Sequence, residues 1–152
     1  MTASSFQVQD LDVAETYELR RRVLRNNDPG ATVHIREDDS DAAWHLGAVA
    51  DGRVVATSSY YAVPYRLRPE FVNATQLRFM AVDPSYQDTG VGKAVIGAAI
   101  ERIRKQGAGL LWANARDTAL GFYLHLGFRT DGSSFVEPTS GLPHTVILLE
   151  LV

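Results

Sequence analysis

Residues 77–93 read LRFMAVDPSYQDTGVGK, and they predict a strand, a loop and the beginning of a helix. The strand is expected over Ala74–Val82, where the apolar residues Leu77, Phe79 and Ala81 recur at every second position. The aspartate and proline that follow end it, because proline cannot donate to the hydrogen-bond ladder and restricts the residue before it. We therefore expect a strand in the centre of a sheet.

The loop after this strand leads into a helix predicted over Gly90–Gln106. Apolar residues recur there on two adjoining helical stripes, which indicates deep packing, and Gly107 is a natural stop. Gly90 and Gly92 remove side chains that would block a ligand at the amino end of this helix. Unpaired amide hydrogens and the helix dipole favour phosphate oxygens at such a place, and Lys93 adds a positive charge.

Two common phosphate-binding motifs do not fit this loop. The nucleotide-triphosphate loop needs serine or threonine after its lysine, and Lys93 is followed by Ala94. The dinucleotide fingerprint needs a third glycine three residues after Gly92, where the chain has Val95. Two glycines before a helix more often serve only a turn, so the rest of the chain must decide whether an anion binds.

The composition is that of an ordinary globular chain. Its 152 residues fit a single domain, 1–152, with 45% apolar and 22% charged residues. No apolar run approaches the roughly 20 residues that cross a bilayer, and Met1–Asp10 does not look like a secretory signal. The absence of cysteine excludes disulfides and sulfur-bound zinc and fits a cytoplasmic protein, and we expect no metal site. A net charge of -3 gives no general attraction to nucleic acid or membrane.

Strands and helices alternate along the rest of the chain. An extended start over Ser5–Val8 precedes an amphipathic helix over Leu11–Leu24. His45–Ala50 and Arg53–Val63 form a predicted hairpin, since the Asp51-Gly52 pair permits positive φ angles. Four later elements are a strand over Leu110–Asn114, a helix over Asp117–Leu126, a strand from Phe128 to Val136 and a final strand over Thr145–Leu151. This order predicts an α/β fold with one sheet and helices on its faces.

The loop and a second motif together resemble the GNAT superfamily of acetyl-CoA-dependent N-acetyltransferases. The pyrophosphate signature of that family is glutamine or arginine, two residues, glycine, one residue, and glycine or alanine, which Gln87, Gly90 and Gly92 match. Leu77–Pro84 looks like the family's fourth strand, and Asn114–Phe128 resembles its second cofactor-binding motif. The resemblance implies a mixed, largely antiparallel sheet flanked by helices, the acyl-CoA N-acyltransferase fold.

The resemblance also implies an enzyme that moves an acetyl group from acetyl-CoA, its co-substrate, to a primary amine of a small molecule or peptide. The amine would attack directly in a ternary complex, with a strand amide stabilising the oxyanion. Tyr123 matches the tyrosine that is proposed to protonate the departing thiolate. The cofactor contacts implied by the resemblance are Met80, Ala81, Val82, Gln87, Asp88, Thr89, Gly90, Val91, Gly92, Lys93, Asn114, Ala119 and Phe122.

A general base is desirable because an alkyl amine is mostly protonated at neutral pH. Better-known members of the superfamily carry a glutamate on the fourth strand, whereas Ala74–Val82 contains no acidic residue. A base that acts through water is the alternative. Its candidates are Glu37, Asp38, Glu137 and His144.

Several of these residues also have ordinary explanations. Arg78 either faces the substrate or pairs across the sheet, and we favour the substrate because a charge in a central strand is costly without a use. Tyr123 is either the catalytic acid or a core residue whose hydroxyl reaches water. Asn114 contacts pantetheine, caps the next helix, or does both. His144 is either a substrate contact or a turn residue.

Two further groups of side chains are interpreted as structural. The basic cluster of the first helix, Arg20, Arg21, Arg22 and Arg25, is most simply its solvated face. The alternative is that part of it faces an acidic substrate or the cofactor phosphates. Both tryptophans, Trp44 and Trp112, are expected in the core.

Two other functions stay open beside the acetyltransferase. A noncatalytic acyl-CoA-binding sensor would keep the cofactor cleft and lack turnover, and the missing strand carboxylate gives it weight. An unrelated phosphate-binding module is disfavoured, because it leaves Asn114, Phe122-Tyr123 and Gly127-Phe128 unexplained. A homodimer is also open, since dimers are frequent in this superfamily and no sequence feature here establishes a self-complementary face.

Overall fold

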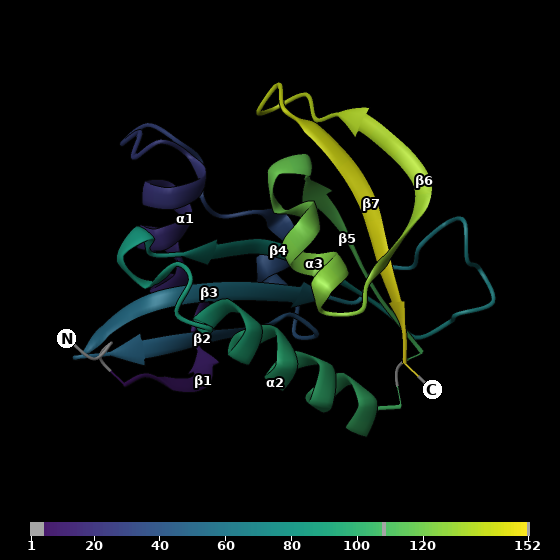
Figure 1. The fold of residues 1–152 in the computed structure, drawn as a ribbon, viewed down its shortest axis with the longest axis horizontal. Coiled ribbons are helices and arrows are strands. Elements are labelled where there is room, and N and C mark those ends of the chain that lie inside the picture. Colours follow the sequence, from purple (N-terminus) through teal and green to yellow (C-terminus); the bar gives the residue numbers. More distant parts are fainter. Residues whose placement is uncertain (1–4, 108, 152) are drawn as a thin grey trace. The chain divides into compact units, whose positions relative to one another are not determined.

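The turn Asp51-Gly52 joins two antiparallel strands, β2 (Trp44–Ala50) and β3 (Arg53–Tyr61), into the hairpin predicted from the sequence (Figure 1). Both turn residues have positive φ, 51° for Asp51 and 75° for Gly52. Two such residues in succession make the turn whose twist matches that of the flanking strands. The structure is a computed structural model, and it describes residues 5–107 and 109–151.

The chain divides into two compact units by its internal contacts. The first unit holds the residues up to Tyr61 together with Arg78–Arg102, and the second holds Ala62–Leu77 together with the residues from Ile103 on. The division falls within strand β4 (Ala74–Val82), whose bounds match the prediction, so this strand belongs to both units. The one-domain interpretation of the sequence stays a prediction.

The strands form a mixed seven-stranded sheet in the order β1-β2-β3-β4-β5-β7-β6. In the first unit, β1 (Gln7–Leu11) runs antiparallel to β2. In the second unit, the start of β4 pairs in parallel with β5 (Leu110–Arg116). Strand β7 (Pro143–Glu150) lies antiparallel between β5 and β6 (Arg129–Val136). This sheet, flanked by helices, confirms the predicted fold class.

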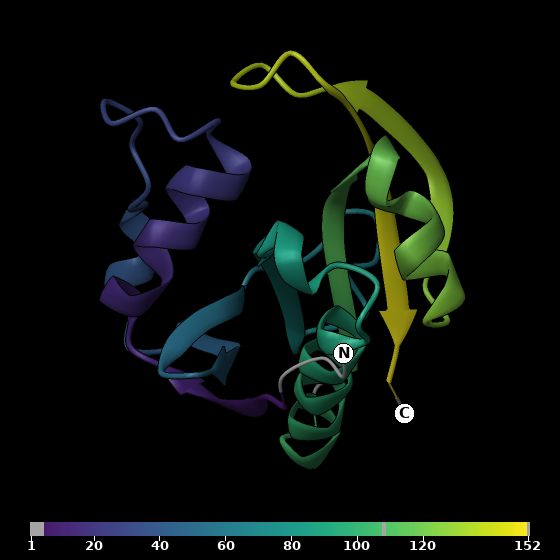
Figure 2. The same cartoon turned by 60° about the vertical axis from the view of Figure 1, so that its left-hand side comes forward.

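Helix α1 (Tyr17–Leu24) packs against β3 in the first unit (Figure 2). The prediction that it starts at Leu11 is wrong, because Leu11 pairs with His45 in the sheet. A short 3-10 helix, η1 (Val13–Thr16), then precedes α1. The extended start predicted over Ser5–Val8 correspondingly continues to the end of β1.

Helix α2 (Val91–Lys105) buries the predicted apolar stripe, with Val95, Ile96 and Ala99 fully inaccessible. Gly107, which was predicted to stop it, has a φ of 76°. No helix in the described part of the chain is long and apolar enough to cross a membrane. The remaining helical segments are η2 (Arg36–Asp39), η3 (Pro84–Tyr86), η4 (Asp117–Ala119) and α3 (Leu120–His125).

Strand β4 departs from its predicted alternation at one residue. Leu77 and Ala81 are buried as expected, whereas Phe79 is only partly buried and has a φ of 56°. A left-handed residue inside a strand turns its side chain out of the regular pleat, as happens at β-bulges. The hydroxyl of Thr57 on β3 donates to the Phe79 carbonyl at 3.4 Å. The regular alternation predicted for Leu77, Phe79 and Ala81 is therefore interrupted at Phe79, because the backbone turns there.

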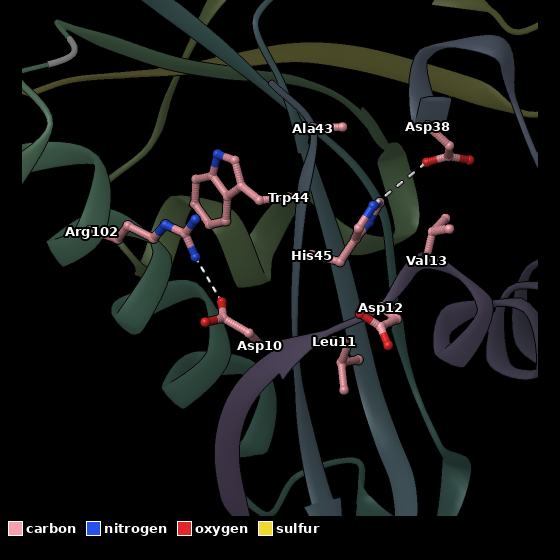
Figure 3. A pocket seen from close by; sticks show the side chains of 9 residues that line it. All are labelled: Asp10, Leu11, Asp12, Val13, Asp38, Ala43, Trp44, His45 and Arg102. Carbon is pink, nitrogen blue, oxygen red and sulfur yellow. Dashed lines mark hydrogen bonds and ion pairs between the residues drawn. The ribbon is translucent and has the colours of Figure 1, made fainter. Parts of the chain in front are cut away.

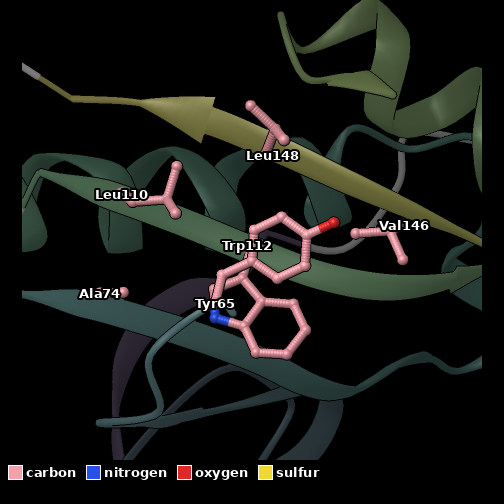
Figure 4. Close-up of a cluster of buried hydrophobic side chains, with 6 residues drawn as sticks. All are labelled: Tyr65, Ala74, Leu110, Trp112, Val146 and Leu148. Atoms are coloured by element: carbon pink, nitrogen blue, oxygen red, sulfur yellow. The ribbon is translucent and has the colours of Figure 1, made fainter. Parts of the chain in front are cut away.

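An apolar cluster fills the interior of the second unit (Figure 4). Trp112 lies at its centre, with its ring 5.0 Å from that of Tyr65, and its indole nitrogen donates to the Val63 carbonyl at 2.9 Å. The loop between β3 and β4 is thereby held against the sheet, and the core position expected for Trp112 is confirmed. The cluster consists of Tyr65, Ala74, Leu110, Trp112, Val146 and Leu148.

Candidate functional site

The loop between β4 and α2 is anchored at its start by Asp83. The Asp83 carboxylate accepts hydrogen bonds from the Ser85 hydroxyl at 2.7 Å and the Ser85 amide at 2.9 Å. Arg22 of α1 donates to it at 2.8 Å, and the Asp83 amide donates to the Val55 carbonyl at 2.8 Å. The bonds from Ser85, with that from Arg22, outweigh burial and lower the pKa of Asp83 to about 2. The loop therefore begins from a fixed, ionised carboxylate.

The end of the same loop turns the backbone into the amino end of α2. Asp88 and Gly90 have φ angles of 63° and 86°, and a side chain at the latter angle is strained even though open space surrounds it. The Gly90 carbonyl accepts from the Ala94 amide at 3.0 Å and so begins the helix. Amides in the first turn of a helix have no partner within it. Here that turn carries no acidic residue and one exposed lysine, Lys93.

This amino end has the local geometry that binds phosphate oxygens. Val91–Lys105 is long enough to have a substantial dipole, whose positive end favours anions. Gln87 and Asp88 are exposed beside it, and Thr89 is tied back to the loop by a hydrogen bond to the Tyr86 carbonyl. The structure thus brings Gln87 to Lys93 together in one turn, at the end of β4, which carries Met80, Ala81 and Val82.

The three predicted cofactor contacts Asn114, Ala119 and Phe122 and the predicted catalytic Tyr123 lie in the second unit. Asn114 is an exposed residue within β5, opposite Val146 of β7. The prediction that it caps the next helix is wrong, because β5 continues to Arg116, which stands before η4 instead. Ala119 ends η4, and Phe122 lies on α3.

Tyr123 is the most buried of these residues, with 6% of its surface exposed. Its ring meets those of Phe122 and Phe128 edge to face, at 5.0 and 5.5 Å between centroids. Burial raises the pKa of the Tyr123 hydroxyl above its ordinary value, because the phenolate would lose its hydration. The hydroxyl accordingly stays protonated at neutral pH and retains a proton that it can donate.

Two of the four candidate bases are occupied by structural bonds. Burial would raise the pKa of Glu137, but hydrogen bonds from Ser140 and Thr139 outweigh it and lower the pKa to about 2. Asp38 behaves similarly: burial is outweighed by hydrogen bonds from Arg20, Ile35 and Tyr61, and its pKa is about 2. A carboxylate with so low a pKa is a weak base and accepts a proton poorly at neutral pH, so neither Glu137 nor Asp38 suits the role of general base.

Of the other two candidate bases, Glu37 is partly exposed and His144 is buried. Glu37 of η2 forms an ion pair with Arg78 of β4, in which Arg78 Nη1 lies 3.5 Å from Glu37 Oε2, and both side chains are partly exposed. Arg78 thus has a partner, although its exposure leaves it able to meet a substrate. His144 of β7 is buried, stacks on Phe135 and has Nδ1 3.0 Å from the Leu142 carbonyl. It lies in a strand, so its interpretation as a turn residue is wrong.

A buried ion pair in the first unit was missed by the sequence analysis. Arg20 of α1 is 1% exposed, so its assignment to a solvated face is wrong. Its Nη1 donates to Asp38 at 2.8 Å and to the Val33 carbonyl at 2.7 Å, and its Nη2 donates to Asp38 at 3.1 Å and Ser59 at 2.8 Å. Tyr61 also donates to Asp38. Arg20 lies three residues after Tyr17 and four before Leu24, which places it on the apolar face of the helix, and this spacing was the available signal.

A cleft of about 320 Å³ opens at the junction of β1 and β2 (Figure 3). Trp44 and His45, neighbours on β2, both line it, and Arg102 of α2 lies over the Trp44 ring while pairing with Asp10 at 2.7 Å. Trp44 is therefore only partly buried, and its predicted core position is corrected. Burial, with the nearby Arg20, lowers the pKa of His45. Of the predicted site residues, this cleft contains Asp38 alone.

The sequence profile of the acetyltransferase (GNAT) family matches residues 12–128 of this chain. The chain belongs to the GNAT acetyltransferase family. It is 31% identical over 135 residues to the uncharacterized N-acetyltransferase YitI of Bacillus subtilis (strain 168), covering 89% of this chain and 90% of that protein. It is 32% identical over 152 residues to the ribosomal protein bS18-alanine N-acetyltransferase of Escherichia coli (strain K12), covering 97% and 95%. This GNAT protein is accordingly an acyltransferase.

The GNAT fold is also found in solved structures of low sequence identity. An aminoglycoside 6'-N-acetyltransferase complexed with coenzyme A superposes with a TM-score of 0.75 at 10% identity, covering 96% of this chain and 97% of that one. At such identity the likeness concerns the fold alone. The mixed sheet that was predicted from the resemblance to the GNAT superfamily is therefore confirmed.

Proposed function

We propose that this GNAT protein transfers an acetyl group from acetyl-CoA to the primary amine of a peptide or small molecule. The amine attacks the thioester carbonyl directly, the carbon–sulfur bond breaks, and no covalent enzyme intermediate forms. The protein supplies positions for both reactants, donors for the developing oxyanion and a proton for the departing thiolate. Its expected compartment is the cytoplasm.

The observation that carries this proposal is the turn at the amino end of α2. Its backbone has positive φ angles at Asp88 and Gly90, and the first turn of α2, whose amides have no partner within the helix, is free of acidic side chains. Those amides would hold the pyrophosphate, with Lys93 as a further cation. Amides of Met80 and Val82 on β4 would bind the pantetheine arm, with Asn114, Ala119 and Phe122 as further cofactor contacts.

We assign the role of general acid to Tyr123. A neutral phenol is needed when the thiolate leaves, and the Tyr123 hydroxyl is neutral at pH 7. Burial raises its pKa and makes it a weaker acid than an exposed phenol, so the assignment rests on the match of Tyr123 to the family's tyrosine. We expect Arg78 of β4 and Glu37 of η2 to contact the acceptor, at its amine or at a neighbouring group, because both side chains are partly exposed. His144 stays the second candidate for this role. The named activity of the bS18-alanine relative makes an amino-terminal alanine one acceptor to test.

The first test is ligand-dependent thermal stability. A ligand that binds only the folded protein raises its melting temperature, so acetyl-CoA and CoA are expected to stabilise the protein and ATP is not. Amines, including peptides that begin with alanine, are then screened for thiol release from acetyl-CoA. Binding without release for any amine would favour the acyl-CoA sensor, and no stabilisation at millimolar acetyl-CoA would contradict the proposal.

Replacing Tyr123 with phenylalanine tests the acid. Tyr123→Phe keeps the buried ring and removes the hydroxyl, so kcat should fall by roughly 100-fold, in the range that a positioned proton donor contributes. KM for acetyl-CoA should change little, because the proton is transferred only as the thiolate leaves. Steady-state thiol release measures both constants. An unchanged kcat would show that Tyr123 is a core residue only.

A further inference from the structure

The buried ion pair of the first unit reaches the left-handed residue of β4. The central carbon of the Arg20 guanidinium lies 4.1 Å from the centroid of the Phe79 ring, within cation–π distance. The guanidinium of Arg78 lies 5.0 Å from the same centroid. Phe79 immediately precedes Met80, whose amide belongs to the next peptide plane. Rotation about the backbone bonds of Phe79 therefore sets the direction in which the Met80 amide points.

The arrangement around Arg20 fixes its guanidinium in one position. Its two terminal nitrogens donate to acceptors from three segments, namely Val33, Asp38 and Ser59. Ser59 also lies 2.7 Å from Nδ1 of His45, so the contacts extend into β2. A planar donor group that is bonded along both edges cannot shift without breaking several bonds at once. The ring of Phe79 consequently rests on a rigid surface.

Stability alone does not account for this arginine. A buried ion pair costs desolvation that its attraction only partly offsets, and apolar replacements of similar volume are often neutral or stabilising. The Arg20 Nε is buried without a hydrogen-bond partner among the described residues, which adds to the cost. An arrangement that is expensive and rigid is better explained by the geometry that it imposes on its neighbour.

We propose that Arg20 is a positioning residue for acetyl transfer, acting through the ring of Phe79 on the Met80 and Ala81 amides. This inference rests on the proposed function, in which those amides stabilise the oxyanion. The guanidinium touches neither substrate nor cofactor. It keeps Phe79 in its left-handed conformation, so that the following amides already point at the carbonyl oxygen before the charge develops. Asp38 holds Arg20 in place.

Two variants of α1 separate an effect on the geometry of the reaction from an effect on the stability of the fold. Arg20→Met keeps much of the side-chain volume and removes the guanidinium. Leu19→Ala is the matched control, because Leu19 is the fully buried neighbour on α1 and takes no part in the hydrogen bonds of Arg20. Both variants are assayed where circular dichroism shows them folded. Arg20→Met should lower kcat at least 10-fold, since a displaced reacting geometry is costly in rate.

The Kd of CoA and the kcat of the other variants show whether Arg20 affects the reaction, cofactor binding or only the stability of the fold. The Kd of CoA for Arg20→Met should stay within about 2-fold of wild type, because the pyrophosphate loop is untouched, and Leu19→Ala should keep kcat within about 2-fold. Arg20→Lys should recover little of the rate, since a lysine cannot bond along two edges. An unchanged kcat in Arg20→Met, or an equal loss in Leu19→Ala, overturns the inference while leaving the proposed function intact. Failure of wild type to bind CoA overturns both.

A double-mutant cycle tests the route through Phe79 and provides a second readout if Arg20→Met does not fold. Phe79→Leu removes the ring and leaves the Arg20–Asp38 bonds in place, so kcat should again fall about 10-fold. If Arg20 acts through this ring, the double variant loses no more rate than the larger single loss. Rate losses that multiply, or a Phe79→Leu variant with wild-type kcat, would contradict the route.

Discussion

The interiors of the two units hold segments against the sheet by different means. In the first unit, Arg20 and Asp38 join α1 and η2 to β3 through directional bonds of 2.8 to 3.1 Å. In the second unit, Tyr65 and Trp112 hold the β3–β4 loop mainly through ring contact and apolar burial, with one hydrogen bond from the Trp112 indole to the Val63 carbonyl. Apolar burial is non-directional and contributes mainly stability. Hydrogen-bonded charges contribute mainly position, and here they lie beside the strand residue whose conformation matters.

The largest effect should come from the apolar region. Trp112→Ala removes a ring at the centre of the cluster, leaves a cavity and takes away the donor to the Val63 carbonyl. The free energy of unfolding should fall by about 4 kcal/mol, as for other large-to-small changes in a core. Urea denaturation followed by circular dichroism measures it. Val72→Ala, at a residue that is 85% exposed, is the control and should change it by less than about 0.5 kcal/mol.

The polar region should respond differently to single and paired changes. Asp38→Ala leaves the Arg20 charge buried without its partner and should cost about 3 kcal/mol. The double variant Arg20→Met/Asp38→Leu removes both charges and should regain most of that loss. Its kcat should nevertheless stay low, because the rigid surface under Phe79 is gone. A double variant that is as unstable as Asp38→Ala would show that this ion pair is a source of stability, like the tryptophan cluster.

The comparison also shows which parts of the molecule a sequence can predict. The bounds of β4, the Asp51-Gly52 hairpin and the glycine stop at 107 depend on local rules, and they were predicted. Trp112 was also expected in the core and lies there, whereas Trp44, for which the same was expected, is only partly buried. The strand and helix patterns located the loop before α2, and the pyrophosphate-binding role that the family resemblance implies for it stays a prediction. These features arise from neighbours in the chain and from apolar patterns that repeat.

The parts that escaped prediction depend on partners far away in the sequence. Arg20 resembled its three neighbouring arginines until Asp38, 18 residues later, was seen to bond it. Phe79 continued an alternating pattern, and only its φ of 56° shows that the strand turns there. A sequence pattern fixes the type of element, whereas a charge inside the fold is decided by the groups that tertiary structure brings to it.

The smallest effect is a difference in acid stability. Folding lowers the pKa of Asp38 from 3.8 to about 2, so the folded state binds this proton less readily than the unfolded state. The contribution of Asp38 to the free energy of unfolding is therefore complete above pH ~4 and is lost as the pH falls toward 2. Its size is about 2 kcal/mol.

Asp83 and Glu137 have similarly lowered pKa values, so the wild-type curve alone does not isolate Asp38. The difference between wild type and Arg20→Met/Asp38→Leu does, because the other two carboxylates are present in both. Urea titrations between pH 2 and 6 should show the wild type losing more stability than the double variant. Parallel curves would mean that the Arg20–Asp38 bonds are no stronger than the hydration they replace, and the rigidity assigned to them would have no energetic basis.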